Sequence, residues 1–209
     1  MRIGVIGPIG AGKSLLASKL AAYFHAQLVE EPVATSPFLA IYYQNIKEVS
    51  FVAQNFFYGE LFLRLHAEEN NQNVITDSTL FSNLVFAEIL QLQGLMNAHQ
   101  VALTYEICDL CRHHIQPLDL EIVIVRSKAQ LFKNVYRRSR DVEKGQEDYL
   151  NFHYQHYYAL LDKIYSHYHL PKSKILYLDP GDMNDPAQWK IIIEQIEEAY
   201  QKNNAVITK

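Results

Sequence analysis

The sequence predicts a single α/β domain in which a five-stranded parallel sheet is covered by helices on both faces. Two observations predict it. A phosphate-binding pattern, G-x-x-x-x-G-K-S, occupies residues 7–14 directly after an apolar run. Short apolar runs then alternate with longer stretches of helical periodicity along the rest of the chain. With 209 residues and no tract that reads as a linker, the chain is long enough to bury one substantial core.

The first strand and the first helix flank this pattern. Residues 3–6 form the apolar run, and residues 15–24 are apolar at helical spacing and rich in helix formers. Glycines let the intervening backbone curl so that its N–H groups face an anion, and the helix adds its positive N-terminal end. Lys13 would reach the β- and γ-phosphates of a nucleotide, and the Ser14 hydroxyl would hold Mg²⁺. The predicted loop consists of Gly7, Pro8, Ile9, Gly10, Ala11, Gly12, Lys13 and Ser14.

Four further strands and six further helices are predicted in chain order. The strands cover residues 27–29, 74–76, 122–125 and 175–178, where short apolar runs occur. The helices lie around residues 48–69, 79–93, 97–114, 128–137, 146–168 and 186–203. Ligands of such sheets collect at the carboxyl ends of the strands. Glu31, just after the second strand, and Asp77, just after the third, are therefore candidate site residues.

Charge and composition restrict the class of function. The formal net charge of −4 argues against a surface that coats nucleic acid, because such domains usually carry a basic excess. The phosphate site must then be a local positive patch. The phosphate loop begins at residue 7, so we expect no secretory signal before it, and no apolar stretch reaches membrane-spanning length. We expect a cytoplasmic protein.

The two cysteines, Cys108 and Cys111, form a C-x-x-C pattern with two histidines just beyond it. A redox pair or a zinc site is conceivable for this spacing. The preceding residues 101–107 read as helix, however, where positions three apart simply share a face. We expect buried or half-buried reduced thiols.

Residues 30–33, Glu-Glu-Pro-Val, follow the second strand. The proline forces the chain into an extended turn and holds the preceding carboxylate in place, although an exposed acidic turn is the alternative reading. Together with the phosphate loop, this segment resembles the deoxynucleoside kinase family. The resemblance implies that Glu31 is the general base that takes the proton from a nucleoside 5′-hydroxyl.

The resemblance continues through the first half of the chain. Pro37 with residues 41–43 is similar to the segment whose tyrosine meets the deoxyribose 3′-hydroxyl, with Tyr43 the first choice and Tyr42 the second. Gln54 falls where the family places an amide that pairs with the base edge. Its aromatic surroundings could form a flat slot around a base, although a stripe at helical spacing is also typical of ordinary core.

Further matches follow. Asp77-Ser78-Thr79 occupies the place of a D/E-R-S triplet, and Asn83 matches the position of a base-reading aspartate. Arg138 and Arg140, followed by Glu143, are similar to a lid at about residues 138–146. In the family, lid arginines clamp phosphoryl oxygens and the acidic residue helps to read the sugar. A solvated charge run is the alternative interpretation of this cluster.

Three positions depart from the family pattern. Ser78 replaces an arginine that ordinarily orients the catalytic carboxylate, Asn83 replaces the aspartate, and Asn134 stands where an arginine often begins the lid helix. The first departure bears on catalytic competence, and the second bears on base specificity.

The resemblance implies a P-loop NTPase-type fold and an ATP- and Mg²⁺-dependent, homodimeric salvage enzyme that phosphorylates a deoxynucleoside, with a weak preference for purines. Two alternatives remain. One is another small-molecule or nucleoside-monophosphate kinase on the same fold. The other is a nucleotide-binding subunit with little chemistry of its own, which the Ser78 departure keeps open.

Overall fold

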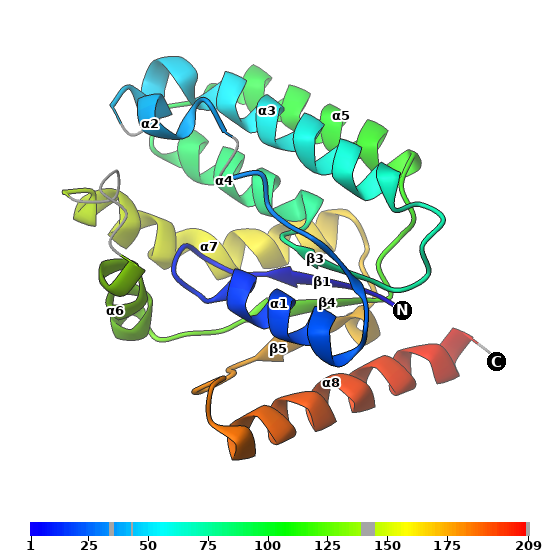
Figure 1. Ribbon diagram of the computed structural model, residues 1–209. Helices are drawn as coiled ribbons and strands as arrows, with labels where there is room; N and C mark the ends of the chain where they lie inside the picture. The colour runs from blue at the N-terminus through cyan, green and yellow to red at the C-terminus, as the bar shows by residue number, and fades with distance from the viewer. Residues whose placement is uncertain (34–35, 43, 139–144, 208–209) are drawn as a thin grey trace.

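A five-stranded, all-parallel sheet runs through the centre of the molecule in the order β2-β3-β1-β4-β5 (Figure 1). The computed structural model describes residues 1–33, 36–42, 44–138 and 145–207. In the register, Ile3 of the central strand pairs with Ile75 on one side and with Leu120 on the other. The predicted α/β class and all five strands are confirmed. The strands are β1 Arg2–Ile6, β2 Gln27–Val29, β3 Val74–Asp77, β4 Leu120–Ile124 and β5 Ile175–Leu178.

Helices cover both faces of the sheet. α1 and α8 pack on one face, α4 and α7 lie on the other, and α3 and α5 form a further layer over α4 (Figure 1). The predicted helices are confirmed with ends shifted by a few residues. α2 was not predicted, because a four-residue helix is too short to show periodicity. The helices are α1 Lys13–Tyr23, α2 Leu39–Tyr42, α3 Ile46–Ala67, α4 Leu80–Leu92, α5 Ala98–His113, α6 Lys128–Arg138, α7 Glu147–His167 and α8 Pro186–Ile207, with a short 3₁₀ turn, η2, at Lys172–Lys174.

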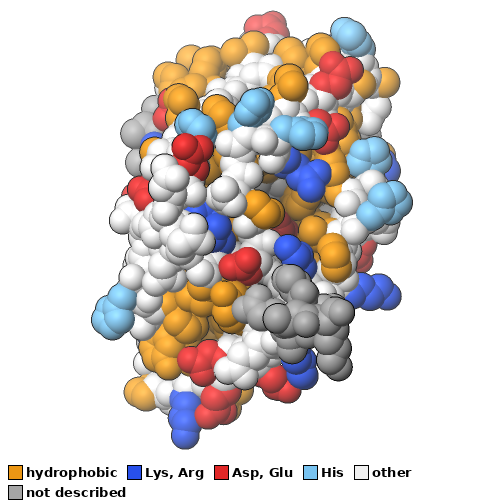
Figure 2. Space-filling view, turned by 90° about the vertical axis from the view of Figure 1, so that its right-hand side faces the viewer, with side chains coloured by type: hydrophobic (Ala, Val, Ile, Leu, Met, Phe, Trp, Pro, Cys, Tyr) orange, Lys and Arg blue, Asp and Glu red, His pale blue; other side chains and the backbone are white. Residues whose placement is uncertain are grey.

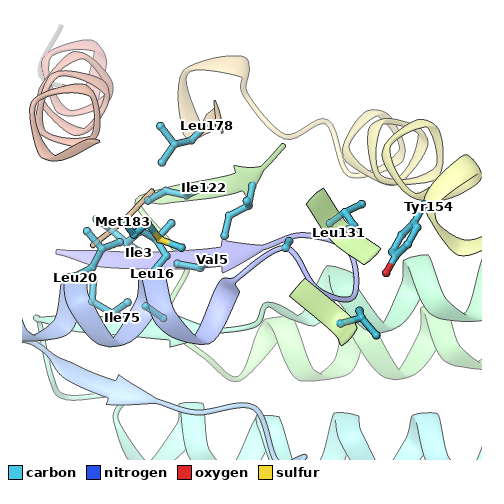
Figure 3. Packing of buried hydrophobic residues seen from close by; sticks show 14 of the residues in the cluster. Ile3, Val5, Leu16, Leu20, Ile75, Ile122, Leu131, Tyr154, Leu178 and Met183 are labelled. Carbon is cyan, nitrogen blue, oxygen red and sulfur yellow. The ribbon is translucent and has the colours of Figure 1, made fainter. Parts of the chain in front are cut away.

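The core lies in two layers because successive side chains of a strand point to opposite faces of the sheet. Ile3 and Val5 of β1 belong to the layer under α1 and α8, whereas Ile6 belongs to the layer under α4 and α7. Figure 3 shows the first layer, in which Leu16 and Leu20 of α1 lie against the strands. The three central strands, β1, β3 and β4, are buried at every residue, and burial on both faces explains their largely apolar sequences.

The predicted phosphate loop lies at the carboxyl edge of the sheet, where β2 and β3 also end. Helix α6 lies beside this edge (Figure 1). The opposite end of the molecule carries the C-terminal ends of α3, α5 and α7. Figure 2 looks at this opposite end, where several histidine side chains gather. His66, His113 and His167 lie in the last turns of α3, α5 and α7.

Both cysteines lie on α5, as predicted, and their thiols are free. Cys108 is buried and Cys111 is half-buried. Burial raises the pKa of the Cys108 thiol to about 11, so this sulfur stays protonated and unreactive at neutral pH. Among the described residues, no helix is both long enough and apolar enough to cross a membrane.

The acidic side chain of Glu121 is buried within the sheet. Glu121 of β4 is 4% exposed and accepts a hydrogen bond of 2.5 Å from the Tyr165 hydroxyl. Burial raises the pKa of Glu121 from its ordinary value of 4.5 to about 7, even though Tyr165, Thr79 and the charge of Arg112 act in the opposite direction. Removal of the carboxylate from water therefore outweighs its favourable contacts.

We predict that Glu121 makes the protein less stable as the pH rises. The folded state holds the proton more tightly than the unfolded chain, so its contribution is complete below about pH 4.5 and is lost as the pH rises toward 7. The shift corresponds to on the order of 3 kcal/mol at most. Glu121→Gln should flatten this part of the curve when the free energy of unfolding is measured by urea denaturation at several pH values. The exposed Glu106→Gln is the matched control, and a Glu121→Gln difference that is equal at pH 5 and pH 8 would contradict the assignment.

Candidate active site

The phosphate loop, residues 7–14, joins β1 to α1 and needs glycine at two positions. Gly10 and Gly12 have φ angles of 81° and 96°, which side chains with a Cβ rarely adopt. A Cβ at Gly10 would lie 2.7 Å from the carbonyl oxygen of Leu131 in α6. The loop therefore lies directly against α6, and the predicted motif has the strand and helix context that it requires.

Lys13 is the first residue of α1, and its side chain turns back over the loop. Its Nζ donates hydrogen bonds to the carbonyl oxygens of Gly7 at 3.0 Å and Pro8 at 3.4 Å. The side chain is half-buried and lines the cavity described next. Its ammonium group is thus held beside the loop, where a phosphate can compete for it.

A cavity of about 830 Å³ opens in front of the phosphate loop. Gly10, Gly12 and Ser14 line one side of it, and residues of α6 line another. Both acidic and basic side chains line this cavity, and most of the basic ones lie on α1 and α6. Its charged lining residues are Lys13, Glu30, Glu31, Asp77, Arg126, Lys133, Arg137, Arg138, Asp179 and Asp182.

The two carboxylates predicted at strand ends both reach this cavity. Asp77 is the last residue of β3 and is 4% exposed, and Glu31 follows β2 and is half-buried. The neighbouring Glu30 is exposed, and its carbonyl oxygen accepts a hydrogen bond of 3.1 Å from Arg64 Nη1. Glu31 is therefore the more enclosed of the two adjacent glutamates.

A second, narrower cavity of about 100 Å³ lies beside the first. Aromatic side chains from three segments, Phe38, Phe57 and Phe86, form its walls. Lys13, Glu31, Val33 and Arg138 line both cavities. The two cavities therefore meet at Lys13, Glu31 and Arg138, which supply one carboxylate and two cations to a ligand that spans them.

Gln54 of α3 and Asn83 of α4, the two residues expected to contact a base, both line this aromatic cavity. They are 5% and 7% exposed. The Asn83 Nδ2 is buried and has no hydrogen-bond partner among the described residues. An unsatisfied buried donor is costly, so this amide suits a ligand that brings an acceptor.

Of the two tyrosines proposed for the sugar, only Tyr42 is described. It is buried, lines the aromatic cavity, and its hydroxyl lies 3.2 Å from that of Tyr149 on α7. Tyr43, the first choice, lies outside the described residues. Tyr149 also lines the cavity and was not singled out from the sequence. Burial and the neighbouring Tyr42 raise the pKa of Tyr149, so its hydroxyl stays protonated.

The described part of the predicted lid begins with Arg138, the last residue of α6, whose side chain lines both cavities. Arg140 and Glu143 lie outside the described residues. Arg137 and Lys133, on the same helix, line the larger cavity in front of the phosphate loop, which we call the phosphate cavity. The C-terminal part of α6 thus supplies three cations to that cavity.

Two of the positions that depart from the family pattern, Ser78 and Asn134, lie close to the phosphate loop or are buried beside β3. Ser78 is 1% exposed, and its hydroxyl has no hydrogen-bond partner among the described residues. Asn134 donates from Nδ2 to the carbonyl oxygen of Gly10 at 2.8 Å. Asn134 therefore contacts the phosphate loop itself, a role that its position in the sequence does not reveal.

Two further residues beside the loop were missed in the sequence. Arg126 donates to Asp179 Oδ1 at 3.0 Å and to the carbonyl oxygen of Gly181 at 2.7 Å, which fixes the chain that lines the cavity after β5. His153 of α7 is fully buried, and its Nε2 accepts a hydrogen bond of 3.3 Å from the N–H of Ile9. The only sequence signal for His153 is its spacing of four from Tyr149, on the buried face of α7.

The chain resembles known proteins along most of its length. The family model described as "Deoxynucleoside kinase" matches residues 3–201. The chain is 32% identical to a deoxyguanosine kinase of Bacillus subtilis over 147 residues, which cover 68% of this chain and 69% of that protein. It is 25% identical to a deoxyguanosine kinase of Lactobacillus acidophilus over 197 residues, which cover 91% of this chain and 86% of that protein.

Solved structures share the fold. The structure of a deoxyadenosine kinase from M. mycoides with the products dCMP and a flexible dCDP bound has a TM-score of 0.80 and 20% identity, and the match covers 95% of this chain and 100% of that chain. A structure of that enzyme with bound dATP has a TM-score of 0.78 and 19% identity, covering 94% and 100% of the two chains.

Proposed function

The chain belongs to the deoxynucleoside kinase family, and from that membership we propose that it transfers the γ-phosphoryl group of ATP to the 5′-hydroxyl of a 2′-deoxyribonucleoside. One observation carries the proposal: Lys13, Glu31 and Arg138 lie where the phosphate cavity meets the aromatic cavity. A hydroxyl acceptor in the aromatic cavity would face Glu31, and phosphates in the other cavity would face the two cations. Glu31 then acts as the general base.

The proposed acceptor is a deoxynucleoside with its base between the aromatic walls. Gln54 and Asn83 would hydrogen-bond the base edge, and the proposed contacts to the 3′-hydroxyl come from Tyr43 and Glu143. The described Tyr42 lines the same cavity and is the second choice for the sugar. The names of the relatives, deoxyguanosine and deoxyadenosine kinases, support a weak preference for purines.

The phosphate donor is proposed to be ATP with Mg²⁺. The metal would neutralise charge on the phosphate oxygens. It usually takes only one or two protein carboxylates together with phosphates and water. Ser14, Glu31 and Asp77 supply oxygen atoms to the phosphate cavity, so the residues present fit this ion. Arg138 and Arg140 are proposed to stabilise the transferring phosphoryl group.

We further propose a cytoplasmic homodimer that serves nucleotide salvage. Exposed apolar side chains on the outer helices support the dimer, because a second subunit would remove them from water. Val52 and Leu63 on α3 and Leu110 on α5 are 50%, 61% and 65% exposed, and these two helices pack against each other.

A second candidate function is favoured by Ser78 alone. A buried serine cannot supply the charge or the reach of the arginine that the family places here. The second candidate is therefore a weakened enzyme that acts mainly as a nucleotide-binding subunit. A nucleoside-monophosphate kinase is the remaining alternative, and the choice of acceptor separates it from the main proposal. Turnover of ATP with each of the four common deoxynucleosides and their monophosphates is the experiment that tests all three.

We predict that Lys13→Ala lowers kcat by about 10²–10³, on the order of 2.7–4 kcal/mol, because the ammonium stabilises charge that spreads over the phosphoryl oxygens. Steady-state kinetics with the preferred deoxynucleoside measure it. The exposed Lys190→Ala, on α8, is the control. A Lys13→Ala enzyme with at least half of the wild-type kcat would refute phosphoryl transfer at this loop.

Adjacent glutamates provide an internal control for the general base. Glu31→Gln should retain substrate binding but lower kcat by about 10²–10⁴, because an amide cannot accept the proton. Glu30→Gln should change kcat less than twofold, since Glu30 is the exposed neighbour. Loss of activity in Glu30→Gln with retention in Glu31→Gln would reverse the assignment.

Ser78→Arg should raise kcat by about tenfold if the site is otherwise built for catalysis, because it restores a charged donor to the phosphoryl oxygens. Ser78→Ala is the control and should leave kcat unchanged, since the serine hydroxyl has no partner among the described residues. Folding of each variant is checked by thermal denaturation. If the wild type binds ATP without turnover and Ser78→Arg gains nothing, the binding-subunit function replaces the kinase proposal.

A further inference from the structure

The phosphate loop is held from two helices at adjacent residues. Asn134 of α6 donates from Nδ2 to the carbonyl oxygen of Gly10 at 2.8 Å. His153 of α7 accepts at Nε2 from the N–H of Ile9 at 3.3 Å. The first contact places a donor on a loop carbonyl, and the second places an acceptor on a loop N–H. These two side chains therefore fix the direction of the loop backbone at Ile9 and Gly10.

The Asn134 amide has its orientation set by a second hydrogen bond. Gln130, one turn earlier on α6, donates from Nε2 to Asn134 Oδ1 at 2.9 Å. With its oxygen occupied in this way, Asn134 presents its NH₂ group to Gly10. The close approach of Gly10 to the Leu131 carbonyl keeps the loop within reach of this donor.

The His153 imidazole has its protonation state set by its surroundings. The side chain is fully buried, and Phe86 and Tyr157 lie against it with ring centroids 4.9 Å and 5.2 Å away. Burial, with a smaller contribution from the charge of Lys13, lowers the pKa of His153 to about 3. The ring is therefore neutral, and Nε2 is an acceptor because it receives the Ile9 N–H.

This arrangement matters for an anion site. A phosphate is bound by backbone N–H groups and is repelled by carbonyl oxygens. The carbonyl oxygen of Gly10 accepts a hydrogen bond from Asn134, and those of Gly7 and Pro8 accept hydrogen bonds from Lys13. These bonds reduce the repulsion between the carbonyl oxygens and a phosphate. When a phosphate draws Lys13 away, the bonds to Asn134 and His153 remain. They hold a loop whose glycines would otherwise allow many conformations.

We propose that Asn134 and His153 are positioning residues that hold the phosphate loop in its anion-binding conformation before nucleotide arrives. The inference rests on the proposed function only in taking ATP as the ligand of the loop. It also assigns a role to Asn134, which differs from the family pattern.

The experiment measures the Kd for MgATP by equilibrium titration, together with thermal unfolding of the nucleotide-free protein. His153→Phe removes the acceptor and keeps a ring, whereas His153→Gln keeps an acceptor near the place of Nε2. Asn134→Ala removes the donor at a half-buried position, where folding is least at risk. His156→Phe, one turn along α7, is the matched control.

We expect His153→Phe and Asn134→Ala each to raise the Kd about tenfold, as when the binding-competent population of the loop falls to about a tenth. His153→Gln should recover most of the wild-type affinity, and His156→Phe should match the wild type. The double variant His153→Phe/Asn134→Ala should lose less binding free energy than the sum of the two single losses, since both bonds select one loop conformation. In the nucleotide-free protein, ¹⁵N-histidine spectra should show an unprotonated Nε2 for His153.

Two results would overturn the inference. One is a folded His153→Phe or Asn134→Ala protein whose Kd lies within twofold of the wild type. The other is a His153→Gln protein as impaired as His153→Phe. Because the readout is binding, a wild type that binds MgATP without turnover would count against the proposed function and leave this test intact.

Discussion

The site depends on the contact between Gly10 and α6. The loop backbone passes so close to the Leu131 carbonyl that no side chain fits between them. This contact brings the C-terminal part of α6, with Lys133, Arg137 and Arg138, to the edge of the phosphate cavity. A protein with net charge −4 thereby obtains a local group of cations where a phosphate would bind.

The parallel sheet determines where the acids lie. Because all five strands run the same way, the ends of β2 and β3 reach the same edge as the phosphate loop, and they bring Glu31 and Asp77 with them. The helices α3 and α4 then place Gln54 and Asn83 around the adjoining cavity. A charged cavity and an aromatic cavity therefore share one boundary, which is lined by the carboxylate of Glu31 and by two cations, Lys13 and Arg138.

The sequence predicted the features that local patterns encode. The glycines and Lys13 form a contiguous motif, and short apolar runs mark all five strands. Gln54 and Asn83 were placed by the family resemblance, because an aromatic stripe alone reads as core. Tyr42 and Tyr43 could not be separated, since adjacent residues near a four-residue helix show no periodicity. His153 contacts a loop residue 144 positions away, and Asn134 one 124 positions away, and no local pattern records such a pairing.

The long separations between the loop and its partners also bear on how the protein folds. The phosphate loop is among the first segments of the chain, yet it is fixed by α6, by α7 and by Met183, whose Cε would lie 3.1 Å from a Cβ at Gly12. Contacts of such high sequence separation carry a large loop-closure entropy and are favourable only together with the rest of the fold. Nucleotide binding should thus report completion of the whole fold, and bound nucleotide should stabilise the entire domain by mass action.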